Sequence, residues 1–170
     1  MEFTHWLTDI TRCGNKEYVL VKYKMSFFSK ATKEIDVCGV VLPNIPLSNI
    51  ILQETAKRLS INNFRGVFLR DELPGRPRAY ECGILNLDDS SGSGTHWVCW
   101  IKRGNYKVYF DGYGLPPPVE LVKYLHSPVY YNSERIQPDN EVFCGHLCLY
   151  VLKKISNDDC NFQEVMNELF

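Results

Sequence analysis

The sequence lacks several features that would place it in a specialised class of protein. Its 170 residues contain no apolar run approaching the roughly 18 residues that a membrane span requires, and the N-terminus has no hydrophobic core of a secretory signal. Internal repeats and long low-complexity tracts are absent. A net charge of −1 argues against a surface built for nucleic acid as a whole. These absences favour an ordinary globular protein that does not enter a membrane.

Cysteine is plentiful, but its pattern does not suggest a disulfide framework. The chain has seven cysteines, an odd number, and no export signal accompanies them. We therefore expect reduced thiols and an intracellular protein, in the cytoplasm or the nucleus. With 45% hydrophobic and 23% charged residues, a chain of this length can bury a core without disulfides or a metal.

The first 45 residues are the hardest to interpret. Their β-branched and aromatic residues predict a strand over 18–23, and a second strand over Glu34–Leu42 that ends at Pro43. We treat residues 1–45 as an N-terminal extension of unclear role, with a β-hairpin as one interpretation. Residues 46–170 form the main domain in this division.

From Leu47 onward the sequence predicts alternating helices and strands. Ser48 is a good N-cap for a helix whose apolar residues share one face. Expected strands cover 66–69, 79–87, 96–102, 106–110 and 129–131, and further helices follow the prolines at 116–118 and cover 144–155 and 162–170. The fold class is α+β, a mainly antiparallel sheet flanked by helices.

Four residues, in chain order His96, Asp111, Gln137 and Cys144, could each perform one task in thiol catalysis. Cys144 opens the most apolar helix, where free N–H groups and the helix dipole stabilise an anion. His96 and Asp111 lie at the start and end of two strands joined by a tight turn. The carboxylate could therefore orient the imidazole and leave its other nitrogen for the thiol. The Gln137 amide could donate to an oxyanion.

Each of these residues also has an ordinary structural explanation. Most cysteines are buried packing residues, a lone histidine is usually not catalytic, and Asp111-Gly112 is a common turn. Gln137 is uninformative by itself. The ordered combination, rather than any single residue, favours acyl-transfer chemistry.

The motifs that carry these residues resemble the adenovirus maturation protease (adenain) family of cysteine endopeptidases. The similar parts are GTHW, YFD followed by glycines, the glutamine, and CGHLC, and the resemblance runs from about Leu47 to Leu169. The adenain-like proteases of Maverick/Polinton transposons and adintovirus-like elements look most similar. The SUMO (ubiquitin-like-protein-specific) proteases belong to the same clan.

The resemblance implies a papain-like or adenain-like fold with the nucleophile at the N-terminus of the central helix. It further implies that Cys144 is the nucleophile, His96 the base and then the acid, Asp111 its orienting partner, and Gln137 an oxyanion donor. Trp97 and Gly145 would contact substrate in a narrow channel that admits small residues, so cleavage would follow glycine-containing sites.

By the same resemblance, substrates would be capsid or core precursor proteins of a viral or virus-like element. The enzyme would be a monomer in the host cytoplasm or nucleus, or packaged in a virion, with no metal or other cofactor.

Two features depart from the adenovirus pattern: aspartate stands where glutamate is usual, and no cysteine lies between Asp111 and Gln137. A disulfide-tethered activating peptide is therefore not expected, and the near-neutral charge gives little support to DNA as an activator.

Three alternatives remain open from the sequence. One is a protease that removes ubiquitin-like proteins, and another is a binding module that has kept the cleft but not the chemistry. The third is a zinc module using His96, Cys99, Cys144, His146 and Cys148, although two of these alternate along a strand and the spacing matches no zinc finger.

Overall fold

The computed structural model describes residues 8–13, 16–21, 33–157 and 160–169, and over 8–21 it describes the backbone alone. The helices are α1 (Asn49–Arg58), α2 (Val119–Leu125), α3 (Cys144–Asn157) and α4 (Phe162–Leu169). The strands are β1 (Thr8–Cys13), β2 (Lys16–Val21), β3 (Glu34–Val37), β4 (Val40–Pro43), β5 (Phe64–Leu69), β6 (Tyr80–Asn86), β7 (Trp97–Arg103), β8 (Tyr106–Phe110) and β9 (Tyr130–Tyr131). The strand predicted over 18–23 is present as β2, whereas residues 22–23 and Phe170 lie outside the described residues.

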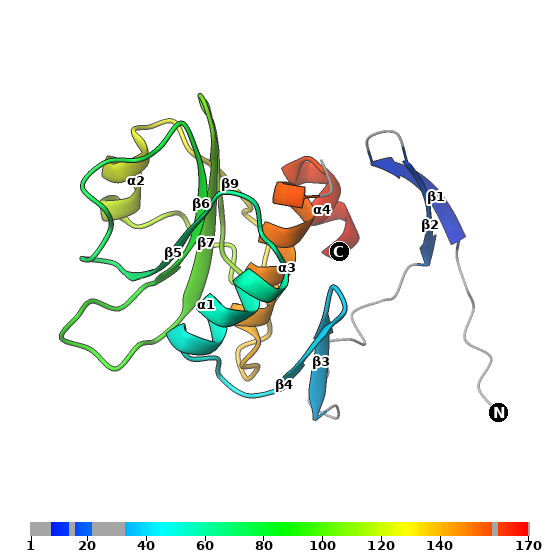
Figure 1. The fold of residues 1–170 in the computed structure, drawn as a ribbon, viewed down its shortest axis with the longest axis horizontal. Coiled ribbons are helices and arrows are strands. Elements are labelled where there is room, and N and C mark those ends of the chain that lie inside the picture. Colours follow the sequence, from blue (N-terminus) through cyan, green and yellow to red (C-terminus); the bar gives the residue numbers. More distant parts are fainter. Residues whose placement is uncertain (1–7, 14–15, 22–32, 158–159, 170) are drawn as a thin grey trace.

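Strands β5 to β9 form one sheet in the order β5-β6-β7-β8-β9. The long central pairs, β6 with β7 and β7 with β8, are antiparallel, whereas β5 and β9 join the two edges in parallel. Two further antiparallel hairpins pair β1 with β2 and β3 with β4. This arrangement confirms the predicted α+β class, a mainly antiparallel sheet flanked by helices (Figure 1).

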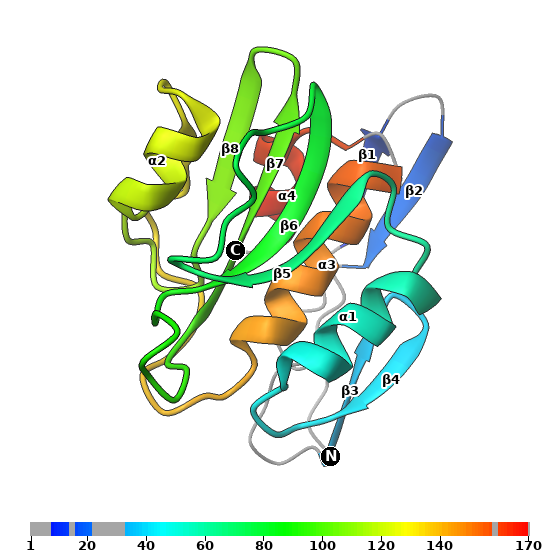
Figure 2. The ribbon, with the colours of Figure 1, turned by 60° about the vertical axis from the view of Figure 1, so that its left-hand side comes forward.

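The sheet is buried on both faces. Successive residues of a strand point to opposite sides, so Cys99 and Ile101 of β7 enter the core cluster that contains α3, and Val98 and Trp100 enter a second cluster with α2. Helices α1 and α3 lie on one side of the sheet and α2 on the other (Figures 1 and 2). This double burial explains why β6 and β7 appear in the sequence as continuous apolar runs.

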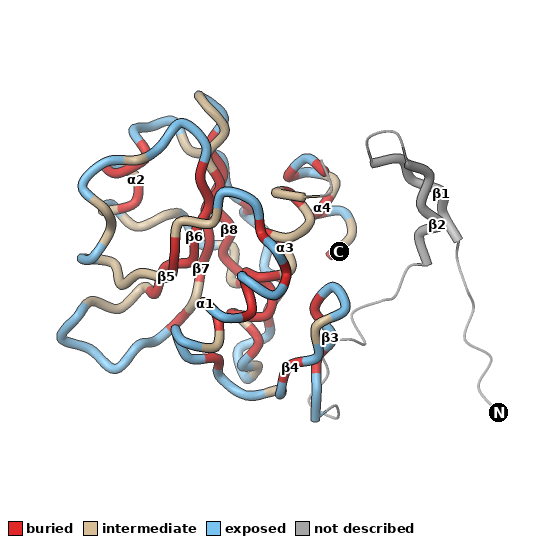
Figure 3. Tube along the Cα trace, in the orientation of Figure 1, coloured by how far each residue is buried: buried red, intermediate tan, exposed pale blue. Residues whose placement is uncertain are grey.

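Helix α3 forms the centre of the larger cluster, as predicted for the segment that starts at Cys144. Its buried residues occur on almost every side: Gly145, His146, Leu147, Cys148, Leu149, Val151, Leu152 and Ile155. Figure 3 shows this helix among the most buried segments of the chain. Apart from the partly exposed Lys153 and Lys154, most of this helix is enclosed by the core, so the surrounding side chains fix the position of Cys144 at its first residue.

The strand predicted over Glu34–Leu42 is wrong in detail, because the segment is a hairpin. Cys38 and Gly39 have φ values of +52° and +87°, and the Gly39 N–H donates to Asp36 Oδ1 at 2.8 Å. Left-handed backbone at two successive residues reverses the chain within a two-residue turn, which separates β3 from β4. The division into residues 1–45 and 46–170 stays a prediction, although β3 and β4 contribute to the same core cluster as α3.

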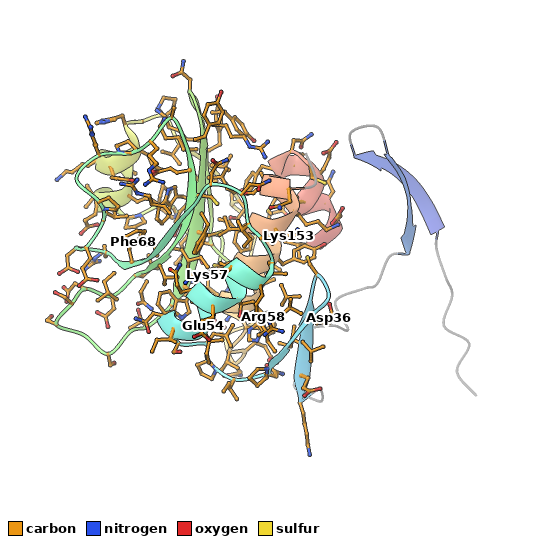
Figure 4. All side chains as sticks on the ribbon, viewed as in Figure 1. Asp36, Glu54, Lys57, Arg58, Phe68 and Lys153 are labelled. Atoms are coloured by element: carbon orange, nitrogen blue, oxygen red, sulfur yellow. The ribbon has the colours of Figure 1, made fainter. Side chains whose placement is uncertain are left out.

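The outer surface of α1 carries charged and polar residues together with the exposed Ile50. The predicted cap is present, since Ser48 Oγ accepts from the Ile51 N–H at 3.3 Å. Glu54, Lys57 and Arg58 are exposed on this helix, and Lys153 lies on α3 (Figure 4). Within the described residues, no helix combines the length and hydropathy needed to cross a bilayer.

The cysteines differ in state. Cys82, Cys99, Cys144 and Cys148 are free thiols. Cys160 is disulfide-bonded, so the expectation that all the cysteines are reduced is wrong for this residue.

Candidate active site

The imidazole of His96 and the carboxylate of Asp111 meet at one end of the β7–β8 hairpin. His96 lies just before β7 and Asp111 just after β8, and the tight turn between the strands brings these ends together. His96 Nε2 hydrogen-bonds to Asp111 Oδ1 at 2.7 Å, and both side chains are buried. This bond fixes the orientation of the ring and leaves Nδ1 available to a second partner.

Cys144 is the second group beside the imidazole, and its side chain lies near enough to raise the pKa of His96. Cys144 is half-buried at the first residue of α3, where helix geometry leaves the first N–H groups without intrahelical acceptors. The structure therefore brings together three of the residues singled out from the sequence, from β7, β8 and α3. Their catalytic roles stay predictions.

The surroundings of His96 favour its protonated form. Burial by itself lowers the pKa of His96, but the hydrogen bonds to Asp111 and Cys144 and the negative charge of both partners outweigh it. The result is a pKa raised from 6.5 to about 9. A protonated imidazole beside a thiol can give its proton to a leaving group in a thiol-dependent reaction.

Asp111 is held in place by its own neighbours. Asn132, which follows β9, accepts from the Asp111 N–H at 3.0 Å and donates to the Asp111 carbonyl at 2.7 Å. The Tyr113 N–H donates to Asp111 Oδ1 at 2.8 Å. Asn132 was not singled out from the sequence, although a polar residue directly after the strand beside β8 could have drawn attention to it.

Gln137 is buried against the turn that follows Asp111. Its backbone N–H donates to the Gly112 carbonyl at 2.8 Å, and its side-chain Nε2 donates to the Glu141 carbonyl at 2.7 Å. An amide nitrogen has two N–H groups, so one holds the side chain in place and the other can serve an oxyanion. An added Cβ at Gly112 would lie 3.0 Å from Gln137 Oε1 and 3.3 Å from Leu147 Cδ1, so Gln137 lies beside the first turn of α3.

The two residues predicted to contact substrate lie on the α1 side of the site. Trp97 is half-buried, and its indole N–H donates to the Leu47 carbonyl at 2.8 Å. Gly145 is buried, and a Cβ there would lie 3.0 Å from Leu52 and 3.3 Å from Leu47. Gly145 thus allows α1 to pack closely on α3, and its predicted contact with substrate, like that of Trp97, stays a prediction.

An aromatic stack, missed in the sequence, covers the imidazole. The ring of Tyr113 stacks on His96 with centroids 4.4 Å apart and planes inclined by 22°. The guanidinium carbon of Arg135 lies 4.8 Å from the centroid of Tyr113. Burial raises the pKa of Tyr113, and the nearby negative charge of Cys144 adds to the effect.

The residues of the zinc alternative do not converge on one point. His146 is buried and its Nε2 bonds to the Pro43 carbonyl at 3.0 Å, whereas Cys99 and Cys148 are fully buried in the larger core cluster. Over residues 33–157 and 160–169, no group of three or more histidine, cysteine or acidic side chains has the geometry of a metal site.

No protein-family model matches the sequence, and no curated protein is significantly similar to it. Two solved structures are similar to the fold: the ASFV pS273R protease, at 16% identity and a TM-score of 0.49, and its selenomethionine form, at 18% identity and 0.48. Each comparison covers 74% of this chain and 65% of the solved chain, which is less than two-thirds of that chain's length.

Proposed function

We propose that this chain is a cysteine endopeptidase that hydrolyses peptide bonds through a thioester intermediate. The observation that carries the proposal is the buried His96, which hydrogen-bonds to Asp111 at 2.7 Å and has Cys144 as the neighbour that also raises its pKa. A carboxylate, an imidazole and a helix-terminal sulfur in this order form the unit that nucleophilic acyl transfer needs.

The reaction proceeds in two halves. The sulfur of Cys144 attacks the peptide carbonyl carbon, and the imidazolium of His96 gives its proton to the leaving amine as the C–N bond breaks. Water then attacks the thioester while His96 accepts a proton from it. The carboxylic acid product leaves, and the Cys144 sulfur is regenerated. In both halves the oxyanion can accept from the Cys144 backbone N–H and from the free N–H of Gln137.

Replacement of the sulfur is the direct test. Cys144→Ala should abolish cleavage of a peptide library while the melting temperature stays close to that of the unmodified protein. Cys38→Ala, at an exposed position in the β3–β4 turn, is the matched control and should cleave normally. Cleavage by Cys144→Ala at the normal rate would rule out the proposed nucleophile.

The proposed substrates are capsid or core precursors of a viral or virus-like transposon, cut after small or glycine-containing sequences. The support is the resemblance of the GTHW and CGHLC motifs to adenain-like proteases, together with Trp97 on the α1 side of the nucleophile. The alternative within the same chemistry is removal of a ubiquitin-like protein from a conjugate. Action in the host cytoplasm or nucleus, or inside a virion, belongs to the same proposal.

A comparison of substrates separates these two possibilities. The protein would be given peptides that contain Gly-Gly sites, a folded ubiquitin-like precursor, and a glycine-free peptide as the control. The proposal expects cleavage of the short peptides at a higher kcat/KM than that of the folded precursor. Efficient cleavage of the folded precursor alone would favour the deconjugating function.

A further inference from the structure

The turn that follows β8 places Tyr113 against His96. The β7–β8 ladder ends at the pair Cys99–Phe110, and the chain then turns over 111–114, where the Gly114 N–H donates to the Asp111 carbonyl at 2.9 Å. Within this turn the ring of Tyr113 stacks on that of His96, with the centroids 4.4 Å apart.

Tyr113 also contacts the partner of the imidazole. Its backbone N–H donates to Asp111 Oδ1 at 2.8 Å, the same oxygen that bonds to His96 Nε2 at 2.7 Å. One residue thus lies against the face of the imidazole and holds the carboxylate oxygen to which the imidazole bonds. A displacement of Tyr113 would disturb both contacts of His96 together.

Arg135 covers the opposite face of the Tyr113 ring and connects it to the segment of Gln137. The guanidinium lies 4.8 Å from the ring centroid, and its Nη1 pairs with Asp139 Oδ1 at 2.8 Å. Arg135 and Asp139 flank Gln137 in the sequence, and the N–H groups of Ile136 and Gln137 both donate to the Gly112 carbonyl. The segment that contains Gln137 is therefore attached to the turn that carries Tyr113, through the hydrogen bonds to Gly112 and the contact of Arg135 with the Tyr113 ring.

We propose that Tyr113, supported by Arg135, is a positioning residue that holds the His96 ring in the one plane that serves both Asp111 and Cys144. The inference rests on the proposed function of this site. Rotation about the Cβ–Cγ bond of histidine has broad minima, so a contact on the face of the ring adds to the restraint that the hydrogen bond to Asp111 provides. An aromatic ring stacked on one face restricts that rotation, and it also stabilises the imidazolium by a cation–π interaction.

The test compares Tyr113→Leu, which removes the ring, with Tyr113→Phe, which keeps the ring and removes the hydroxyl. Tyr80→Leu is the matched control, because Tyr80 is 60% exposed and pairs with Arg103 at the far end of the sheet. Alkylation of Cys144 by iodoacetamide is measured between pH 5 and 10 by mass spectrometry of the Cys144 peptide. This readout needs no substrate.

In the unmodified protein, a plot of the alkylation rate against pH should show an inflection near pH 9, where His96 loses its proton. The groups facing this imidazole are Asp111, Cys144 and Tyr113, and the first two raise its pKa through their hydrogen bonds. Tyr113→Leu should move this inflection toward the ordinary histidine pKa of about 6.5, because the freed imidazole loses its contacts with Asp111 and Cys144. Peptide cleavage by this variant should fall at least about tenfold in kcat, with little change in KM.

The conservative and control variants complete the design. Tyr113→Phe should keep a pH profile close to that of the unmodified protein, and Tyr80→Leu should match it throughout. If Tyr113→Leu does not fold, Arg135→Ala replaces it, because half of the Arg135 side chain is exposed. Arg135→Ala should move the pH profile in the same direction by a smaller amount.

The outcomes separate this inference from the proposed function. An unchanged pH profile and kcat in folded Tyr113→Leu would overturn the positioning role, even if the unmodified protein is an active protease. If the profile shifts as expected but no protein in the set cleaves peptides, the positioning role is supported and the proposed function fails. A loss of activity in Tyr113→Phe equal to that in Tyr113→Leu would assign the effect to the hydroxyl and overturn the stacking argument.

Discussion

At the scale of single residues, His96 determines the pH range of the proposed activity. Its pKa of about 9 keeps the imidazole protonated at neutral pH. The leaving amine needs the proton of the His96 imidazolium, so kcat/KM should stay constant up to about pH 9 and decrease at higher pH. The measurement is a pH–rate profile with a peptide substrate, and a fall already complete by pH 7 would contradict the assigned environment of His96.

Gln137 provides a second prediction at this scale. If its free N–H stabilises the oxyanion, Gln137→Ala should lower kcat by roughly 10²–10³. The substrate carbonyl has little charge before attack, so KM should change far less. Gln163→Ala, on the exposed face of α4, is the control and should leave kcat unchanged. A variant that loses only substrate affinity would show that Gln137 binds substrate and does not stabilise the oxyanion.

At the scale of the elements, the contact of β6 with β7 depends on a glycine. Gly83 pairs with Trp100, and a Cβ at Gly83 would lie 2.3 Å from Trp100 Cη2. The indole is fully buried and its N–H donates to Glu81, which also accepts from Tyr124 of α2 at 2.6 Å. The indole therefore cannot move away without disturbing the attachment of α2 to the sheet.

Gly83→Ala should consequently destabilise the fold by about 1–3 kcal/mol or more, as overpacking of a rigid core does. The free energy of unfolding can be measured by urea denaturation. Gly75→Ala is the control, since a Cβ at Gly75 would meet no atom within 4 Å. Equal stabilities of the two variants would mean that β6 and β7 can separate to admit a methyl group.

At the scale of the whole molecule, the β3–β4 hairpin behaves as part of the main core. Ile35, Val37 and Leu42 are buried in the cluster that contains α3. Ile35→Ala should therefore cost about 2–5 kcal/mol in the free energy of unfolding, whereas Val41→Ala, at a position 53% exposed, should cost far less. A small, equal effect of both substitutions in urea denaturation would support a boundary near residue 45.

The pH dependence of stability provides another prediction for the whole molecule. Burial lowers the pKa of His146 from 6.5 to about 4, although the hydrogen bond to Pro43 opposes the shift. Between these values the unfolded chain binds a proton that the folded chain does not, so stability falls as the pH drops from 6.5 to 4. The loss is on the order of 3 kcal/mol.

His96 acts in the opposite sense: the stability that it contributes is present below pH 6.5 and is lost as the pH rises through about 9.

Substitution of His146 isolates its contribution to the pH dependence of the free energy of unfolding. His146→Gln should flatten the decline in the free energy of unfolding between pH 6.5 and 4, since glutamine does not titrate. His126→Gln, at an exposed position, is the control and should keep the decline. Denaturation curves at several pH values measure both, and an unchanged slope in His146→Gln would place the acid sensitivity elsewhere.

The sequence by itself determined the features that depend on short stretches of chain. The tight turn signal at Arg103-Gly104-Asn105 between two strands predicts the β7–β8 hairpin, and this local geometry brings His96 to Asp111. Apolar spacing predicts a helix that starts at Cys144.

Only the tertiary structure decided the contacts between distant segments. Asn132 binds Asp111 from the strand beside it, and Arg135 reaches Tyr113 from the Gln137 segment. The carbonyl of Pro43 meets His146, more than a hundred positions away along the chain. Such contacts arise when the apolar faces of separate elements are buried together. The periodicity of apolar residues in the sequence shows that an element has an apolar face, but it does not show which other element packs on that face. The sequence thus supplies the reactive residues, and long-range packing sets their orientation.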